Sequence, residues 1–327
     1  MSKILVTTVP FADKNPLPLH LLEKAGIDYQ INPIGRRLKE DELADMVADF
    51  DALVAGTEPI TEKVMANGAN LKLISRVGIG LDNVDLLAAE RRGIQVSYTP
   101  DAPAPAVAEL TVGMMLTLLR HVHVANIQMH QGLWRRHFGS RVSEITIGII
   151  GVGRIGRGVI KRLASFEPYK ILVNDLSPIA SFSSMPWIQS ATKEEIYREA
   201  DLIALHVPLT AQTKNMIRYD HLKAMKRDAI VINTSRGGII NELDLARTLN
   251  EGHLAGAAID VFEQEPYVGE LQNIERCLLT SHMGSMSVDC RARMEIEATE
   301  EAVRILTDQP LENAVPQEEY DVQRQGL

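Results

Sequence analysis

Residues 145–175 carry the most constraining pattern of the chain, ITIGIIGVGRIGRGVIKRLASFEPYKILVND. The apolar run at 145–150 predicts a buried strand, and the apolar residues at helical spacing after it predict a helix. A second apolar run, at 171–173, ends in Asp175. Three glycines with the spacing G-x-G-x-x-G separate the first strand from the helix. This combination predicts a strand, a tight turn, a helix and a second strand that ends in a carboxylate.

The glycines and the acid suit a dinucleotide. Gly151 would allow the tight turn, Gly153 would let a pyrophosphate approach the backbone, and Gly156 would let the helix pack close to the sheet. Free N–H groups at the start of the helix favour phosphates. Asp175 would accept hydrogen bonds from a ribose diol and repel a 2′-phosphate, so we expect NAD rather than NADP. The alternative, a glycine-rich turn that binds nothing, is disfavoured by the flanking elements.

Length and charge limit the class of protein. A chain of 327 residues corresponds to about two domains. The net charge of −9 disfavours nucleic acid or an anionic membrane as the main partner. Two cysteines, Cys277 and Cys290, fit a reducing cytoplasm rather than a disulfide framework. The sequence shows no signal-peptide pattern and no apolar run of about 18 residues, so we expect a cytoplasmic protein with a small-molecule ligand.

Apolar runs alternate with helical patterns in two successive sets. The first set of strand candidates lies at 3–9, 27–31, 51–55, 71–75 and 94–98. The second set lies at 145–150, 170–174, 201–207, 229–233, 255–260 and 277–280. Such alternation predicts parallel sheets covered by helices. We expect an α/β protein with two doubly wound parallel-sheet domains, in which a Rossmann-type NAD domain at 104–290 is inserted into a flavodoxin-like substrate domain made of 1–103 and 291–327.

Two long helical patterns flank the second set of strands. Residues 106–132 follow a proline-rich stretch and are apolar on most faces, which is typical of a core helix or a subunit interface. We favour a subunit interface through this helix, because one domain cannot easily cover every face. A second pattern, at about 288–307, would return the chain to the first domain. Two crossings between domains would form a cleft that opens and closes.

Polar side chains follow the strand candidates of the second domain, where doubly wound sheets bind their ligands. Arg236 would bind a carboxylate through two N–H groups and polarise the adjacent carbonyl. The imidazole of His282 would give or take a proton, and Glu265 would favour its charged form. With NADH beside them, these residues would reduce a 2-oxo acid, or oxidise a 2-hydroxy acid in reverse.

Each of these residues also has a purely structural interpretation. Arg236 would then cap a turn, Glu265 would be a solvated loop carboxylate, and His282 a loop histidine with local partners. Their joint position beside a dinucleotide fold favours catalysis. His206 would line the adenosine side of the cofactor or simply end its strand. No cluster of residues has metal-ligand spacing, so we expect no metal.

The loop after the strand candidate at 71–75 is the expected substrate contact of the first domain. Free N–H groups of Val77 and Gly78 would hold a substrate carboxylate, and Arg76 would add positive charge. A plain turn between a strand and a helix is the alternative.

Several motifs together resemble the NAD-dependent D-2-hydroxyacid dehydrogenase family: SRVGIGLDNVDLLAAERRGIQV, VAELTVGMMLTLLRH, GIIGVGRIGRGV, LHVPLTAQTKNMI, INTSRGGIINELDLARTL, GAAIDVFEQEP and SHMG. The resemblance covers nearly the whole chain and is greatest for D-3-phosphoglycerate dehydrogenases without a C-terminal regulatory domain. It implies a homodimer, the catalytic set Arg236, Glu265 and His282, and a contact of Asp260 with the nicotinamide carboxamide. With the strand-end residues, the expected cofactor-binding set is Gly151, Gly153, Arg154, Ile155, Gly156, Asp175, His206, Val207, Pro208, Thr234, Ser235, Asp260 and Gly284.

The chain departs from the family at three positions. Phosphoglycerate enzymes usually carry an arginine for the substrate phosphate near the position of Ala55. Ile79 stands where a threonine is common, and Ser281 where a proline is usual.

These departures leave the substrate open. Candidates are 3-phosphoglycerate and an unphosphorylated acid of the glyoxylate or hydroxypyruvate type. A NAD-sensing, corepressor-like binding protein on the same fold is a further alternative. Three arginines after the long helix would supply anion contacts, also into a partner subunit's cleft, or form a solvated basic face: Arg135, Arg136 and Arg141.

Overall fold

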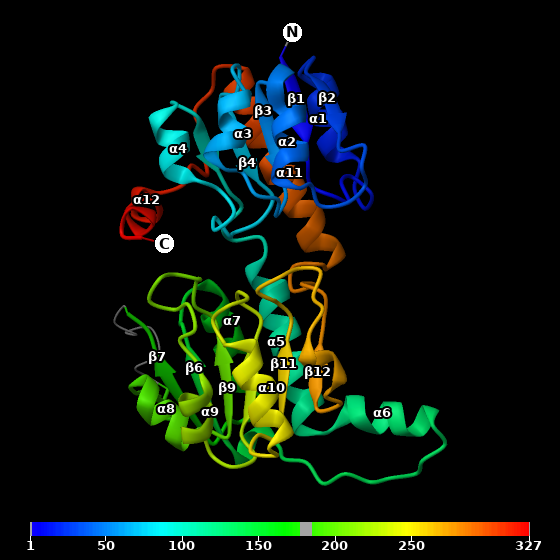
Figure 1. The fold of residues 1–327 in the computed structure, drawn as a ribbon, viewed down its shortest axis with the longest axis vertical. Coiled ribbons are helices and arrows are strands. Elements are labelled where there is room, and N and C mark those ends of the chain that lie inside the picture. Colours follow the sequence, from blue (N-terminus) through cyan, green and yellow to red (C-terminus); the bar gives the residue numbers. More distant parts are fainter. Residues whose placement is uncertain (1, 177–184, 327) are drawn as a thin grey trace. The chain divides into compact units, whose positions relative to one another are not determined.

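The computed structural model describes residues 2–176 and 185–326. The chain forms two compact units: unit 1 comprises residues 1–103 and 286–327, and unit 2 comprises residues 104–285. Each unit is a parallel sheet with helices on both faces (Figure 1). The α/β fold with two parallel sheets is therefore confirmed. The return to unit 1 lies slightly before the expected position after residue 290, because Ser287 already caps the helix that belongs to unit 1.

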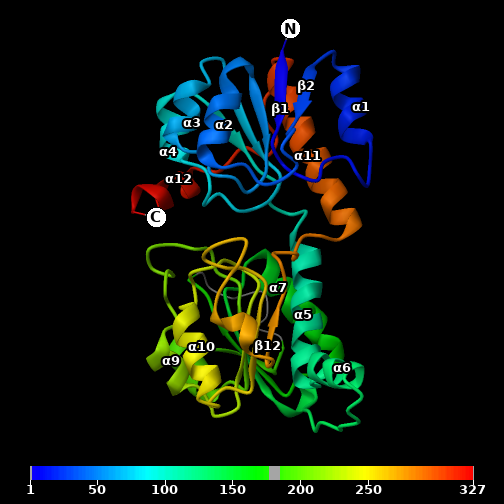
Figure 2. The ribbon, with the colours of Figure 1, turned by 45° about the vertical axis from the view of Figure 1, so that its right-hand side comes forward.

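Unit 1 has a five-stranded sheet with the order β2-β1-β3-β4-β5. Its strands are β1 (Lys3–Val6), β2 (Asp28–Ile31), β3 (Ala52–Ala55), β4 (Leu73–Arg76) and β5 (Gln95–Ser97). Figures 1 and 2 show α1 and α11 together on one face of the sheet, with α2 and α3 on the other. The helices are α1 (Leu17–Lys24), α2 (Glu40–Met46), α3 (Glu62–Asn67), α4 (Leu86–Arg91), α11 (Val288–Leu306) and α12 (Gln317–Arg324). This order is the flavodoxin-like one.

Unit 2 has, within its described residues, a seven-stranded sheet with the order β12-β11-β10-β9-β6-β7-β8. The strands are β6 (Thr146–Ile150), β7 (Lys170–Asn174), β8 (Ile188–Ser190), β9 (Leu202–Leu205), β10 (Ile230–Asn233), β11 (Gly256–Ile259) and β12 (Cys277–Leu279). The helices are α5 (Ala104–Leu119), α6 (Val122–His130), α7 (Arg154–Leu163), α8 (Lys193–Glu199), α9 (Tyr219–Ala224) and α10 (Glu242–Asn250). The strand order reverses between β6 and β9, as in Rossmann-type domains, and ligands bind at such a point.

The expectation of a single helix at 106–132 is wrong. The chain forms α5 and α6, which meet at an angle of 64°. His121 between them adopts a left-handed backbone conformation with φ of 52°, which ends α5. Half of α5 is buried in the core, whereas no residue of α6 is buried. In the described part of the chain, only this bent pair, and no single helix, has the length and apolar character that a membrane span needs.

Two short elements carry no signal in the sequence. The edge strand β8 has only three residues, and two of them are exposed, so no apolar run marks it. The residues just before it, 177–184, lie outside the described part of the chain. Helix α12 has no buried residue and is held by side-chain contacts: Gln323 Nε2 donates to the carbonyl of Val84, and Arg324 pairs with Glu90. Tertiary contacts rather than local pattern therefore form both elements.

Gly148 offers a test of the packing between β6 and α8. A Cβ at this position would overlap Ile196 Cγ2 and lie 3.2 Å from Ala200 Cβ. We expect Gly148→Ala to lower the free energy of unfolding by about 1–3 kcal/mol, because the core must shift to admit the methyl group. Urea-induced unfolding measures this change.

The matched control is Gly113→Ala on α5, where no heavy atom lies within 4 Å of the added Cβ. Helix propensity predicts unchanged or higher stability for this variant, by up to about 1 kcal/mol. Equal losses of stability in both variants would contradict the packing explanation.

Candidate active site

In the turn between β6 and α7, Gly151 and Gly156 are closely packed against neighbouring backbone, whereas the space beside Gly153 is open. Gly151 has a φ of 94°, and a side chain there would overlap the carbonyl oxygen of His206. A side chain at Gly156 would overlap the carbonyl oxygen of Gly151. No heavy atom lies within 4 Å of a Cβ placed on Gly153. The backbone at Gly153 can therefore meet a phosphate group directly.

The first turn of α7 and the carboxylate of Asp175 lie beside the glycine turn. Helix α7 begins at Arg154 and Ile155, and its N-cap residue, Gly153, has no side chain that could cap the first turn. At the end of β7, Asp175 Oδ2 accepts a hydrogen bond of 2.6 Å from the N–H of Val152. The carboxylate thus lies beside the turn, where a ribose diol would meet it. These residues fit the pyrophosphate and ribose of a dinucleotide.

His206 follows β9 on the same edge of the sheet. Both of its ring nitrogens are buried and have no hydrogen-bond partner in the described part of the chain. Burial lowers the pKa of His206 to about 4, so the ring is neutral near pH 7. Buried polar atoms without a hydrogen-bond partner are rare, and these two lie in a residue that adjoins the glycine turn. Val207 and Pro208 follow His206 in the chain. This edge of the sheet therefore fits a ligand that brings its own polar groups.

The turn after β10 is built around Asn233, which the sequence analysis missed. Asn233 is 2% exposed. Its Oδ1 accepts hydrogen bonds from the N–H and the hydroxyl of Ser235, and its Nδ2 donates to the carbonyl of Arg236 at 2.8 Å. Thr234 Oγ1 lies 2.8 Å from Thr111 Oγ1 of α5. The position of Arg236 is thus fixed by the buried amide at the strand end.

The structure brings His282 and Glu265 into contact. His282 Nδ1 lies 2.9 Å from Glu265 Oε2 and 3.0 Å from Oε1, and the two side chains are 37% and 25% exposed. The N–H of Phe262 donates to Glu265 Oε1 at 3.1 Å. A carboxylate can only accept, so Nδ1 carries the proton of this bond. Nε2 has no partner among the described residues and can meet a substrate.

The turn with Arg236 and the loop with Glu265 touch each other. A Cβ on Gly237 would overlap the backbone of Phe262, so only glycine allows this approach. The N–H of Glu263 donates to Glu242 Oε1 of α10 at 2.7 Å, which ties the same loop to the helix. Three of the expected residues, on three strand ends, therefore lie on one edge: Arg236, Glu265 and His282.

Asp260 holds the loop that carries His282. Its carboxylate is 1% exposed and accepts hydrogen bonds from the Thr280 hydroxyl at 2.5 Å and from the N–H groups of Met283 and Gly284 at 2.9 Å each. Its backbone carbonyl accepts the N–H of His282 at 2.7 Å. His282 itself has a φ of 50°, which costs energy for a residue other than glycine. The bonds to Asp260 compensate that strain and fix the imidazole.

In unit 1, the expectation of free N–H groups at Val77 and Gly78 is wrong. The N–H of Val77 donates to the carbonyl of Ala55 at 2.9 Å, because the pairing of β3 with β4 continues one residue past the strand. The N–H of Gly78 donates to Thr99 Oγ1 at 2.8 Å. In the described structure, the next two N–H groups of this loop, those of Ile79 and Gly80, meet no acceptor.

Arg76 is 3% exposed and its guanidinium turns inward. Nη1 donates to the carbonyls of Ala55, at 3.0 Å, and Gly56, and Nε donates to the carbonyl of Gly80 at 3.1 Å. Arg76 therefore shapes the loop from beneath, and its positive charge lies under the N–H groups of Ile79 and Gly80.

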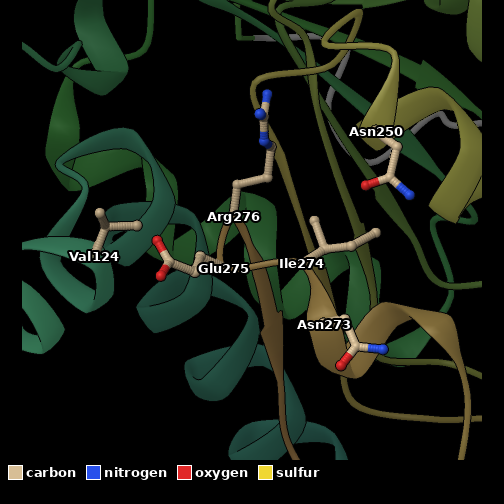
Figure 3. Close-up of a pocket in the computed structure, with 6 residues that line it drawn as sticks. All are labelled: Val124, Asn250, Asn273, Ile274, Glu275 and Arg276. Atoms are coloured by element: carbon tan, nitrogen blue, oxygen red, sulfur yellow. The ribbon is translucent and has the colours of Figure 1, made fainter.

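A surface hollow of unit 2 lies away from these residues. Its lining comes from α6, the end of α10 and the segment before β12 (Figure 3): Val124, Asn250, Asn273, Ile274, Glu275 and Arg276. These segments lie at the amino ends of the strands, opposite the edge with His282. No group of three or more potential metal ligands occurs in residues 2–176 and 185–326.

The hydrogen bonds of Asp260 give a stability prediction. Asp260→Asn should lower the free energy of unfolding by about 1–3 kcal/mol, because its NH₂ group would face buried N–H donors. Hydrogen exchange at Met283 and Gly284 should become faster. Thr280→Val removes only one donor to the same carboxylate and should cost about 1 kcal/mol or less. Unchanged exchange in Asp260→Asn would show that the carboxylate does not hold the loop.

Comparison with known proteins agrees with this geometry. Residues 112–284 match the model of the D-isomer specific 2-hydroxyacid dehydrogenase NAD-binding domain. The chain is 34% identical to a hydroxypyruvate reductase from Thermotoga maritima over 85% of this chain and 92% of that protein. It is 35% identical to a D-3-phosphoglycerate dehydrogenase from Methanocaldococcus jannaschii over 96% of this chain but only 59% of that protein.

A solved structure gives the same result for the fold. The TT0316 protein from Thermus thermophilus superposes with a TM-score of 0.87 at 32% identity, covering 96% of this chain and all of that chain. The sequence motifs, the dinucleotide turn and these relatives agree. The chain therefore belongs to the D-isomer specific 2-hydroxyacid dehydrogenase family and is an NAD-dependent oxidoreductase that acts on CH–OH groups.

Proposed function

We propose that this enzyme interconverts a small 2-oxo acid and its D-2-hydroxy acid, with Arg236, Glu265 and His282 as the catalytic residues. The observation that carries the proposal is the contact of 2.9 Å between His282 and Glu265, on the edge that also holds Arg236 and the dinucleotide turn. A proton donor, a carboxylate-binding cation and a cofactor site then share the carboxyl ends of one sheet. Hydride transfer to a carbonyl needs these three elements.

The roles of the three side chains follow from their bonds. NADH supplies the hydride when bound. Arg236 binds the substrate carboxylate and polarises the carbonyl with its fixed N–H groups. His282 donates a proton from Nε2 to the carbonyl oxygen and is then neutral. Glu265 accepts from Nδ1, which stabilises the imidazolium before the transfer and fixes the orientation of the ring. In the oxidation direction, His282 accepts the hydroxyl proton.

The proposed cofactor site uses the strand ends of unit 2. The pyrophosphate meets the glycine turn and the start of α7, and the adenosine ribose meets Asp175. The remaining contacts are those of the strand-end turns. The proposed set is Gly151, Gly153, Arg154, Ile155, Gly156, Asp175, His206, Val207, Pro208, Thr234, Ser235, Asp260 and Gly284, with Asp260 contributing mainly through the loop it holds.

The substrate site of unit 1 is proposed at the loop after β4. The N–H groups of Ile79 and Gly80 and the charge of Arg76 suit a carboxylate. The family's phosphate-binding arginine has no counterpart at Ala55, which is fully buried. An unphosphorylated acid such as hydroxypyruvate or glyoxylate therefore suits the chain better than 3-phosphoglycerate. NADH oxidation with a panel of 2-oxo acids tests this choice, and no turnover would favour a NAD-sensing role.

Arg236 gives the sharpest test of the mechanism. We expect Arg236→Ala to lower kcat/KM by about 10²-fold or more, because the cation binds charge that develops in the transition state. NADH affinity, measured by fluorescence titration, should stay the same. Arg247→Ala is the control, since Arg247 pairs with Glu251 on the surface of α10 and should leave kcat/KM unchanged. An Arg236→Ala enzyme with normal kcat/KM would refute the assigned role.

We also propose a homodimer in which a second copy covers α6 and the segment after it. This arm exposes large apolar side chains: Met129 is 52% exposed, Trp134 77% and Phe138 fully. Monomers rarely expose so many large apolar groups in one place. Arg135, Arg136 and Arg141 lie in the same segment and would then face the partner.

The interface can be tested by two substitutions in this arm. Trp134→Ser combined with Phe138→Ser should give a monomer in light-scattering measurements, because the covered apolar area is lost. Tyr169→Ser is the control: Tyr169 is 69% exposed but lies after α7, outside the arm. A dimer of unchanged stability in the double variant would place the interface elsewhere.

The composition supports a cytoplasmic location without nucleic acid or membrane partners. Cys277 and Cys290 are both free and buried, as in a reducing compartment. The net charge of −9 opposes binding to nucleic acid or anionic lipid.

A further inference from the structure

Glu58 is a buried carboxylate at the carboxyl end of β3 that the catalytic mechanism does not use. Glu58 is 1% exposed, whereas its neighbour Thr57 is exposed. Buried carboxylates are expensive unless they are hydrogen-bonded. Glu58 Oε1 meets this condition, since it accepts the hydroxyl of Thr7 and the N–H of Gly56, the latter at 2.9 Å.

The second oxygen, Oε2, has no donor within the described residues. Among the described residues, the side-chain atoms that are both fully enclosed and without a hydrogen-bond partner are ring nitrogens of His123 and His206. Oε2 of Glu58 is not one of them. Oε2 therefore reaches the outside through a small opening. It lies over the backbone of Gly56, only 2.8 Å from the position that a Cβ of Gly56 would take.

Glu58 is held rigidly beside the proposed substrate loop. Asn83 Nδ2 donates to the carbonyls of Glu58, at 2.7 Å, and Gly56, at 3.2 Å. Arg76 Nη1 donates to the same carbonyl of Gly56, whose N–H donates to Glu58. The cation under the substrate loop and the carboxylate with the open oxygen therefore flank a single residue.

The structural role of Glu58 needs only one of its two oxygens. Oε1 alone joins the ends of β1 and β3, through Thr7 and Gly56. By contrast, the buried Glu301 of α11 serves such a role with its oxygens: it accepts the N–H groups of Glu312 and Asn313 and the Asn313 side-chain amide. In Glu58, one acceptor remains for a group from outside the chain.

We propose that Glu58 determines substrate specificity: its Oε2 accepts a hydrogen bond from a hydroxyl on the substrate's third carbon and repels a phosphate at that carbon. This inference rests on the proposed function, with the substrate carboxylate at the loop after β4. A hydroxyl donating to a carboxylate forms a strong, charge-assisted bond. A phosphate brings negative charge against the open oxygen, and such repulsion is an effective means of excluding a competing ligand. The favoured substrate class is thus an unphosphorylated 3-hydroxy-2-oxo acid.

The test compares three 2-oxo acids in the wild-type enzyme and Glu58→Gln, with NADH as cofactor. Hydroxypyruvate carries the hydroxyl, phosphohydroxypyruvate carries the phosphate, and glyoxylate has no third carbon. The amide keeps the bonds to Thr7 and Gly56 but removes the charge. We expect the wild type to prefer hydroxypyruvate, and Glu58→Gln to raise the ratio of kcat/KM for phosphohydroxypyruvate over hydroxypyruvate by about tenfold or more. Turnover of glyoxylate should not change.

Glu301→Gln is the matched control, because it neutralises a buried carboxylate of the same unit that lacks an open oxygen. It should leave the ratio unchanged even if it lowers the unfolding temperature. Calorimetric titration with D-glycerate and 3-phosphoglycerate in the presence of NAD gives a readout without turnover. In this titration, Glu58→Gln should reduce the difference between the affinity for D-glycerate and the affinity for 3-phosphoglycerate.

Three results would overturn the inference. An unchanged ratio in Glu58→Gln, or an equal loss with all three acids, would make Glu58 a structural residue while the proposed function stands. A wild-type preference for phosphohydroxypyruvate would also refute it and leave the reaction class intact. If the wild type turns over none of the acids, the proposed function fails, and the inference fails with it.

Discussion

The parallel pairing of β6 with β9, from Ile147 and Leu202 to Ile150 and Leu205, brings the glycine turn against the end of the next strand. At that point the strand order reverses, and the backbone of Gly151 meets the carbonyl of His206 so closely that no side chain fits. The turn after β6 and the turn after β9 thus form one continuous surface of backbone and buried imidazole. The rest of the proposed cofactor site depends on this contact, because it fixes where α7 begins.

Buried polar side chains at the strand ends hold the residues that we propose as catalytic. Asn233 shapes the turn with Arg236, and Asp260 binds the loop with His282. A buried polar group without hydrogen-bond partners would lower the stability of the fold, because the interior has a low dielectric constant. Each loop therefore closes around its buried side chain. This coupling ties the loop geometry to the sheet. It also lets His282 remain in a left-handed conformation that a free loop would relax.

The sequence predicts those parts of the molecule that depend on local pattern. The two alternating sets of strands, the glycine turn and the strand-end residues can be read from apolar runs and spacing, since parallel strands leave their carboxyl ends on one edge. Elements that depend on tertiary contact could not be predicted. Strand β8 and helix α12 have no apolar pattern, and the break at His121 requires a backbone conformation that the residue type does not indicate.

The misjudged loop at Val77 has the same origin. Spacing alone suggests a turn with free N–H groups, but hydrogen bonds to Ala55 and Thr99 occupy the first two and shift the free donors to Ile79 and Gly80. The roles of Asn233, Asp260 and Glu58 were equally hidden, because a polar residue in a loop pattern looks solvated until its burial is known. Their hydrogen-bond partners, rather than their burial, distinguish them from one another.

The contrast between Asp260 and Glu58 shows how hydrogen bonding can separate a positioning role from the proposed role in substrate recognition. Both carboxylates are 1% exposed at strand ends of a parallel sheet. Asp260 uses both oxygens on donors of its own loop, through three hydrogen bonds that close it. Glu58 satisfies the demands of the fold with one oxygen and keeps the other open. A buried charge with a free acceptor is tolerated only where something outside the chain can satisfy it, whether water or a ligand. Because the proposed catalytic residues lie on unit 2, such an acceptor on unit 1 is well suited to choose among substrates without altering them.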